Sequence, residues 1–355
     1  MNAKLVEDIA NAVLYEGYIL YPYRRSAVKN RQRFNFGVLA PREYCEAQTG
    51  ENCSFQCQCL ATCGAGGEPA ELEVKVRFLR LVERSVCAIS PASEELPKAG
   101  SPNYRAVQSL TVNGRTYEPW QEAADCSIAV RCGIEELMRA QHGESTAFSY
   151  KKEFESLRDA DGRIAGVIVR EQQRLTTEVS IAAQAVGDGI VRITVRATNT
   201  TPVRIAADWK REDALRHSLL SAHAILHIEG GEFISLLDPP EEFQEAARAC
   251  ANVSVWPVLI GEESARDAML ASPIILYDYP QIAPESAGEL FDGTEIDEIL
   301  ALRILTLTDA EKQEMRSGDE RARQILERTE SLPPEQMMKL HGVLREIRPL
   351  SDEAK

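Results

Sequence analysis

The clearest hydrophobic pattern in the chain is a strict alternation over residues 71–78. Leu72, Val74, Val76 and Phe78 would share one face of a strand, and the residues between them are charged. A period of two is typical of a β-strand that is buried on one face and solvated on the other. The pattern therefore predicts a strand lying against a core.

Further strands are predicted by apolar runs between residues 147 and 207, separated by short turns rich in glycine and aspartate. Residues 148–157 and 164–177 flank one such turn. Asn113-Gly114 is a favoured hairpin turn between two shorter strands, and another hairpin is predicted around Gly230-Gly231. Strands at such short spacing usually pair with their neighbours, so we expect an antiparallel, sandwich-like sheet structure.

Helices are predicted at both ends of the chain. Leu5, Ile9 and Val13 recur at helical spacing and predict an amphipathic helix over residues 3–15. Near the other end, Thr308-Asp309-Ala310-Glu311 has the form of a capping box and predicts a helix that follows it. Together with the strands, these helices indicate an α+β, antiparallel β-rich fold.

The chain is predicted to have two parts. Residues 1–238 would form the β-rich part, with the N-terminal helix and a cysteine-rich loop over residues 41–69. Residues 239–355 would form an α/β segment of the type αβαβ, ending in helices and packed on the same core. Within this segment, Pro273–Tyr277 is an apolar run predicted to be a core strand. The loop after it, residues 278–288, has a shape set by prolines and tyrosines, which favours a partner surface.

Composition is that of an ordinary globular chain, with 355 residues, 44% hydrophobic and 27% charged. The formal net charge of −15 argues against a general nucleic-acid binder, because phosphate binding needs a basic surface. No apolar run approaches the roughly 20 residues of a membrane span, and the acidic N-terminus does not resemble a signal peptide. The expected location is therefore the cytoplasm, with no membrane contact.

Four of the nine cysteines form the pattern C-x3-C-x-C-x3-C, namely Cys53, Cys57, Cys59 and Cys63. Four thiolates can bind Zn²⁺ or an iron–sulfur cluster, so these residues are the candidate metal ligands. Their spacing is not the paired spacing of common zinc ribbons, nor that of a ferredoxin. The alternative is a loop that carries free thiols.

His223 and His227 would lie on one face of a strand, with Asp238 nearby in the sequence. Such residues could form a metal or acid–base site of a hydrolase-type enzyme, or they could simply pack within a sheet. No nucleophile elbow, P-loop or dinucleotide-binding motif is present, which disfavours the enzyme classes that those motifs mark. A protein without enzymatic activity is the favoured interpretation.

Two oppositely charged segments are the candidate partner-binding surfaces. A basic stretch over residues 24–33 lies between two predicted aromatic strands, residues 17–23 and 34–39, and an acidic stretch covers residues 285–298. Segments of opposite charge can orient a protein partner, although the basic stretch could instead pair with acids of this same chain. The residues predicted to bind a partner are Tyr21, Tyr23, Arg24, Arg25, Arg31, Tyr277, Asp278, Tyr279, Glu285 and Asp292.

Two segments carry a resemblance to a known family. They are LYEGYILYPYR at residues 14–24, and SPIILYDYP at residues 272–280 continuing to LFDGTEIDE at residues 290–298. They resemble an uncharacterised bacterial family associated with [NiFe]-hydrogenase gene clusters, in which the cysteine-rich stretch is not a feature. The resemblance implies an accessory or assembly role in hydrogenase production, and it implies no known activity and no catalytic residues.

The leading hypothesis from the sequence is thus a cytoplasmic accessory protein, without enzymatic activity, that binds hydrogenase subunits or maturation factors. A metal- or cluster-binding protein that uses the four cysteines is the second hypothesis. A hydrolase-type enzyme that uses the histidines is the third.

Overall fold

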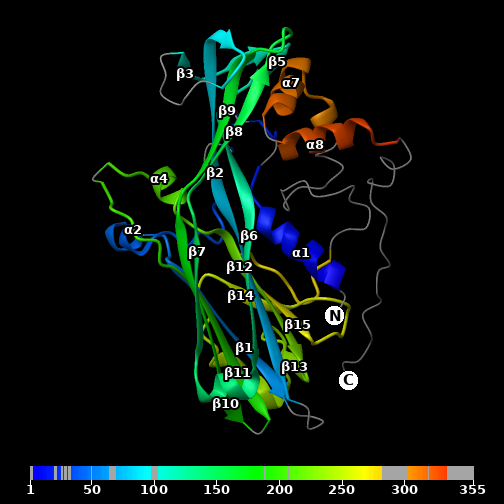
Figure 1. The fold of residues 1–355 in the computed structure, drawn as a ribbon. Coiled ribbons are helices and arrows are strands. Elements are labelled where there is room, and N and C mark those ends of the chain that lie inside the picture. The colour runs from blue at the N-terminus through cyan, green and yellow to red at the C-terminus, as the bar shows by residue number, and fades with distance from the viewer. Residues whose placement is uncertain are drawn as a thin grey trace.

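Strand β2 (Glu71–Ser93) runs along most of the length of the computed structural model and organises the strands around it (Figure 1). Its first half pairs with β12 (Leu220–Glu229) and β6 (Trp120–Gly133). Its second half pairs with β9 (Ile164–Gln172) and β3 (Tyr104–Val107). The predicted strand over residues 71–78 is confirmed, and it continues well beyond the alternating segment.

The structure describes residues 3–333 apart from 20–21, 25–26, 28–29, 31–32, 49, 64–68, 97–102, 188, 207, 282–302 and 319. Within this range the predicted α+β fold is confirmed, with antiparallel sheets, an N-terminal helix and later helices. No described helix is long and apolar enough to cross a membrane.

Two antiparallel sheets face each other. In the first, the strand order is β13-β1-β11-β10-β7. These strands are β1 (Ser54–Cys63), β7 (His142–Phe148), β10 (Leu175–Gly187), β11 (Ile190–Asn199) and β13 (Gly231–Ile234). The second has the order β14-β15-β12-β2-β9-β8, with β3 and β6 also paired to β2. Its remaining strands are β8 (Lys151–Arg158), β14 (Trp256–Leu259) and β15 (Ala268–Ser272).

The main core fills the space between these two sheets. The predicted apolar face of β2 lies in it, with Val76 and Phe78 fully buried. Ile193 of β11 and Phe233 of β13 are buried in the same cluster from the opposite sheet. Alternating apolar residues on two facing sheets are the basis of a β-sandwich, so the sandwich-like prediction is also confirmed.

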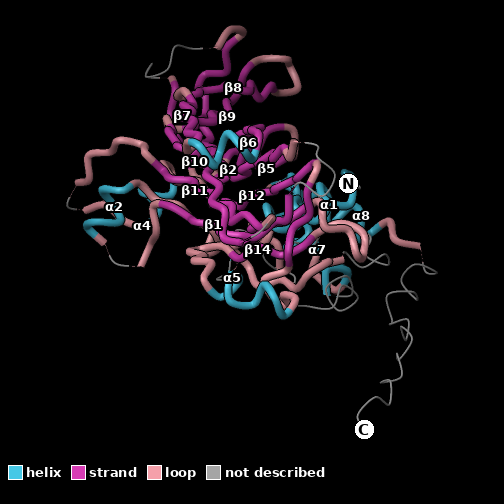
Figure 2. The backbone as a smooth tube through the Cα atoms, turned by 90° about the horizontal axis from the view of Figure 1, so that it is seen from below, coloured by secondary structure: helices cyan, strands magenta, loops and turns pink. Residues whose placement is uncertain are grey.

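Helices cover the other face of the second sheet. Helix α1 (Ala3–Tyr15) packs Val6, Ile9 and Val13 against Ile225 and its neighbours. Helices α7 (Asp309–Ser317) and α8 (Glu320–Glu330) pack against the same side of β2, and both views show α1, α7 and α8 on one side of the strands (Figures 1 and 2). The predicted capping box of α7 is formed by Thr308 and Glu311.

The second half of β2 extends beyond the sandwich with β8, β9 and β3. On this extension lies the small hairpin of β4 (Leu110–Val112) and β5 (Arg115–Tyr117). Its turn residues Asn113 and Gly114 have φ of 50° and 76°, as the predicted type I′ hairpin turn requires. The other described helices are short. Among them are α2 (Arg42–Ala47), α3 (Ile134–Arg139), α4 (Arg211–Leu215), α5 (Gln244–Arg248) and the 3₁₀ turn η2 (Glu241–Phe243).

Several local predictions are wrong. The described parts of residues 17–23 and 34–39 form no strand; Tyr18, Ile19 and Phe34 are buried as anchors beside the helices instead. The cysteine-rich loop over residues 41–69 is replaced by α2 and β1, because its alternating apolar residues pair with β11. An apolar or aromatic run indicates that its side chains are buried, and an irregular segment can bury side chains as well as a strand can.

Residues 239–281 do not form an αβαβ unit. Strand β14 pairs antiparallel with β15, and β15 pairs with β12, so this segment extends the second sheet. Strand β15 ends at Ser272, so the strand predicted at Pro273–Tyr277 does not form. The predicted hairpin around Gly230 does not form either, because the chain passes there from β12 in one sheet to β13 in the other. The two predicted parts of the chain therefore share a sheet.

A buried polar network ties α1 to the sheet. Arg77 of β2 points toward α1, and its side chain is only 3% exposed. Its guanidinium forms ion pairs with Glu7 of α1 at 3.0 Å and with Asp125 of β6 at 2.6 Å. It also donates a hydrogen bond to the side-chain oxygen of Asn11 at 2.9 Å. One buried cation thus links a helix and two strands.

Replacing Arg77 with methionine should destabilise the fold. The substitution keeps much of the buried hydrocarbon, but it leaves Asp125 without this cation and Glu7 paired only with Lys75, 3.4 Å away. Because both carboxylates are partly exposed and can be rehydrated, we expect the free energy of unfolding to fall by about 2 kcal/mol, measured by urea denaturation.

The matched control is Arg131→Met. Arg131 of β6 also bridges two carboxylates, those of Glu71 at 2.7 Å and Glu229 at 2.8 Å, but its side chain is half exposed. Exposed ion pairs contribute little, so its urea midpoint should stay at the wild-type value. Equal losses in the two variants would contradict the argument from burial.

Candidate functional site

The described part of the basic segment pairs within the chain. Tyr23 is 1% exposed and belongs to the cluster between β2 and the helices. Arg24 forms ion pairs with Glu311 of α7 at 3.0 Å and with Glu314 at 3.7 Å. These contacts correspond to the alternative in which the segment pairs with acids of the same chain. Of the other predicted partner-binding residues, Tyr21, Arg25, Arg31, Glu285 and Asp292 lie outside the described residues.

Arg33, from the same segment, is buried as an anchor. Its guanidinium lies over the ring of Trp120, 4.1 Å from the ring centroid. It donates a hydrogen bond to the carbonyl oxygen of Tyr18 at 3.0 Å and another to the carbonyl oxygen of Gln121. A stacked, hydrogen-bonded guanidinium of this kind fixes the segment to β6.

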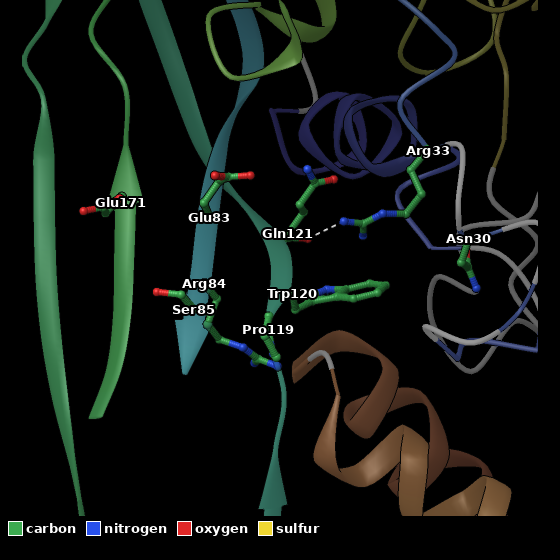
Figure 3. A pocket seen from close by; sticks show the side chains of 9 residues that line it. All are labelled: Asn30, Arg33, Glu83, Arg84, Ser85, Pro119, Trp120, Gln121 and Glu171. Carbon is green, nitrogen blue, oxygen red and sulfur yellow. Dashed lines mark hydrogen bonds between the residues drawn. The ribbon is translucent and has the colours of Figure 1, made fainter. Parts of the chain in front are cut away.

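A polar cavity of about 380 Å³ opens beside this anchor (Figure 3). Trp120 and Arg33 lie on one side of it, and Glu171 of β9 lies on the other. Its charged groups have partners within the chain. Arg84 donates to the carbonyl of Glu118 at 2.9 Å, Glu83 pairs with Arg216 at 3.1 Å, and Glu171 pairs with Lys152. A ligand would have to displace these contacts, so this cavity is not the preferred site.

The four candidate metal ligands lie on or directly before one strand. Cys57 and Cys59 are fully buried on the inner face of β1, in line with Phe55 and Ala61. At roughly 3.3 Å per residue, Cys53 and the last residue of the pattern are about 30 Å apart along the strand. The structure therefore does not bring the four thiols together. The described residues contain no group of three or more histidine, cysteine or acidic residues placed to hold a metal ion.

The candidate histidines of β12 do not form a shared site either. His223 is fully buried, and its Nδ1 lies 2.8 Å from the carbonyl oxygen of Ser221, so Nδ1 carries the proton. Its Nε2 has no hydrogen-bond partner among the described residues. His227 approaches Asp267 at 3.7 Å, which is beyond hydrogen-bond distance. Both residues therefore pack within the sheet, which is the alternative that the sequence left open for these histidines.

Two of the three predicted residues that follow β15 stabilise the fold. The carboxylate of Asp278 accepts hydrogen bonds from the backbone N–H of Leu259 at 2.7 Å and from the hydroxyl of Ser235 at 2.5 Å. The backbone N–H of Tyr279 donates to the carbonyl of Leu259 at 2.7 Å. Tyr277, in contrast, is 81% exposed and is available for a partner.

An apolar groove of about 540 Å³ lies next to Tyr277. Three stretches of chain line it: Leu237 after β13, residues 254–256 at the start of β14, and residues 272–276 after β15. Ile275 is 95% exposed and Trp256 is 41% exposed. A large apolar side chain left in water contributes no burial energy to the fold, and such patches mark interaction surfaces.

Half of the exposed large apolar side chains belong to this part of the surface. Of ten such side chains among the described residues, Leu237, Trp256 and Ile275 line the groove, and Val253 and Tyr277 adjoin its lining in the sequence. The sequence pattern draws attention to Tyr277 but misses Leu237 and Trp256. The tertiary structure brings these segments together from both sheets, and no local sequence signal indicates it.

The backbone edge of β14 beside this groove is closed. The N–H and the carbonyl of Leu259 are both occupied by the 278–279 segment, and Pro257 has no N–H to donate. An edge that cannot offer regular hydrogen bonds does not accept an added strand. A partner would therefore bind the groove through side chains.

Comparisons with known proteins place the chain in no family. Neither a protein family nor a curated protein matches it. One solved structure with a match is the Salmonella type III secretion injectisome secretin InvG in the open gate state. The sequence identity is 10% and the TM-score is 0.13; the match covers 69% of this chain and 60% of the secretin chain. A TM-score this low does not indicate a shared fold.

Burial of His223 should make stability depend on pH. Burial, with the nearby Arg77 cation adding to it, lowers the pKa of His223 to about 4 from its ordinary value of 6.5. Between these two values the unfolded chain binds more protons than the folded one. The free energy of unfolding should therefore fall as the pH is lowered from 6.5 towards 4, by about 3 kcal/mol from this residue.

The variant His223→Asn tests this assignment by urea denaturation at pH 7 and near pH 4.5. The asparagine amide can still donate to the carbonyl of Ser221 but does not titrate, so the variant should lose less stability on acidification than the wild type. A variant with the same pH dependence as the wild type would show that His223 is not the titrating group.

Three thiols with a raised pKa should react slowly. Burial raises the pKa of Cys45 to about 11 and raises the pKa of Cys63, while a hydrogen bond with Cys57, together with burial, raises that of Cys59. Because the thiolate is the reactive form, iodoacetamide near pH 8 should label these residues in the folded protein far more slowly than it labels glutathione. Mass spectrometry of native and urea-denatured samples measures this. Rapid native labelling would contradict the raised pKa values of these thiols.

Proposed function

We propose that this protein is a non-enzymatic accessory protein that binds a protein partner through the apolar groove. The observation that carries the proposal is the concentration of exposed Leu237, Trp256 and Ile275 around one cavity. Exposed apolar patches rimmed by polar residues are typical of protein–protein interfaces, and aromatic residues such as tryptophan often dominate their binding energy.

The closed edge of β14 supports insertion of partner side chains into the groove. The polar groups at the two other candidate sites, the histidines of β12 and the polar cavity, support partner binding over catalysis. In the described residues, the predicted histidines pack in the sheet, and the charged groups of the polar cavity are held by partners within the chain. The loop that was predicted to bind a partner contributes Tyr277 to the same surface.

The resemblance of residues 14–24 and 272–280 to the hydrogenase-associated family suggests which partner to test. We propose that the partner is a hydrogenase subunit or maturation factor and that the two proteins meet in the cytoplasm during metalloenzyme assembly. The resembling segment at residues 272–280 includes Ile275 and Tyr277, so it coincides with one wall of the groove.

Affinity purification of the tagged protein from its native host tests the proposal. The wild type should recover hydrogenase subunits or maturation factors, and the variant Ile275→Asp/Tyr277→Ser should lose at least nine-tenths of that recovery. Both side chains are highly exposed, so the double variant should keep the wild-type unfolding midpoint.

The matched control is Phe154→Ser. Phe154 is 44% exposed on β8, at the far end of the sheet from β14 (Figure 1). This variant removes an exposed aromatic side chain away from the groove and should recover the partner normally. Recovery of the protein alone by the wild type, together with normal hydrogenase activity in a deletion strain, would refute the proposed function.

A further inference from the structure

The segment that builds the apolar groove is strongly acidic. Residues 232–281 contain nine acidic residues against two arginines, a net charge of −7 within a chain whose formal charge is −15. The acidic residues are Glu232, Asp238, Glu241, Glu242, Glu245, Glu262, Glu263, Asp267 and Asp278. One seventh of the chain thus carries nearly half of its net negative charge.

Three acids that follow the groove residue Leu237 in the chain face solvent. Asp238 directly follows the groove residue Leu237, and the exposed Glu241 and Glu242 follow in turn η2. None of these three carboxylates forms an ion pair with another described residue, whereas most of the ionic groups along β2 are paired. The chain that lines the apolar groove at Leu237 therefore continues into three carboxylates without an ion pair to a described residue.

We infer that the groove binds a basic amphipathic segment of its protein partner, in which large apolar side chains are flanked by lysines or arginines. This inference rests on the proposed function and specifies the chemistry of the partner. The apolar side chains would enter the groove beside Trp256 and Ile275. The basic residues would face Asp238 and the carboxylates of η2, which would also speed association at low salt.

Charge also favours a basic segment over the other possible occupants of the groove. A second copy of the chain would bring two acidic segments together, and like charges at an interface oppose association. Anionic lipid surfaces and nucleic acids carry the same sign of charge and would be repelled. A basic segment is the occupant that matches both the apolar and the charged character of this surface.

Two fluorescent designed peptides of about 16 residues test the inference with the full-length protein. Both have the same leucines on one helical face, while the polar positions are lysine in one and glutamate in the other. In fluorescence anisotropy, the lysine peptide should bind at least tenfold more tightly than the glutamate peptide, and raising the salt from about 50 to 500 mM should weaken it.

Three protein variants separate apolar insertion from simple charge attraction. Ile275→Asp adds a negative charge, so pure attraction predicts tighter binding of the lysine peptide, whereas insertion into the groove predicts at least a tenfold loss. Asp238→Asn/Glu241→Gln/Glu242→Gln should weaken the lysine peptide several-fold and reduce its salt dependence. Phe154→Ser should leave its binding unchanged.

The outcomes distinguish failure of this inference from failure of the proposed function. If both peptides bind equally and Ile275→Asp weakens both, the groove binds apolar side chains but the preference for a basic segment is overturned. If the lysine peptide binds regardless of Ile275→Asp, or if neither peptide binds, the inference is also overturned. A dimer seen by light scattering that Ile275→Asp dissociates would assign the groove to a second copy of the chain instead.

Discussion

Strand β2 depends on being buried on both faces. Val76 and Phe78 meet the opposite sheet, while Leu79 and Leu81 meet the helical layer. A strand of this kind is stable only when two separate layers cover it, and these layers come from distant parts of the chain. The later helices α7 and α8 are therefore part of the core, despite the many charges on their outer faces. Arg77 and Arg80 are buried cations on this strand. The acidic partners of Arg77 explain how its charge is accommodated.

The local features of the fold could be predicted because each depends on neighbouring residues. The alternation of β2, the Asn113-Gly114 turn and the capping box at Thr308 all have short-range physical causes. Strand β1 was harder, because its buried cysteines resemble metal ligands as much as core residues. Strand β6 was missed, since polar residues such as Asp125 sit among its apolar positions and hide the period of two.

The candidate site could be predicted only in part. An exposed partner residue was expected around Tyr277, and its exposure fits that expectation. The predicted strand at Pro273–Tyr277 was wrong, because an apolar run looks the same whether its side chains enter a core or remain on the surface for a partner. Pairing of β14 with β15 places Trp256 beside Ser272 in the groove, and Leu237 reaches the groove from β13 of the other sheet. No local pattern encodes either placement. The apolar groove thus arises from tertiary structure.

The ion pairs of Arg24 with α7 have a consequence for synthesis of the chain. Leu14 and Tyr18 share one cluster with Met315 and Leu326, so this segment leaves the ribosome long before the helices that cover it. Until that helix emerges, the early segment exposes an apolar surface that the finished protein conceals. Nascent chains with such a surface are prone to aggregate or to recruit chaperones. The order in which the chain is made therefore sets a period of vulnerability that the mature fold does not show.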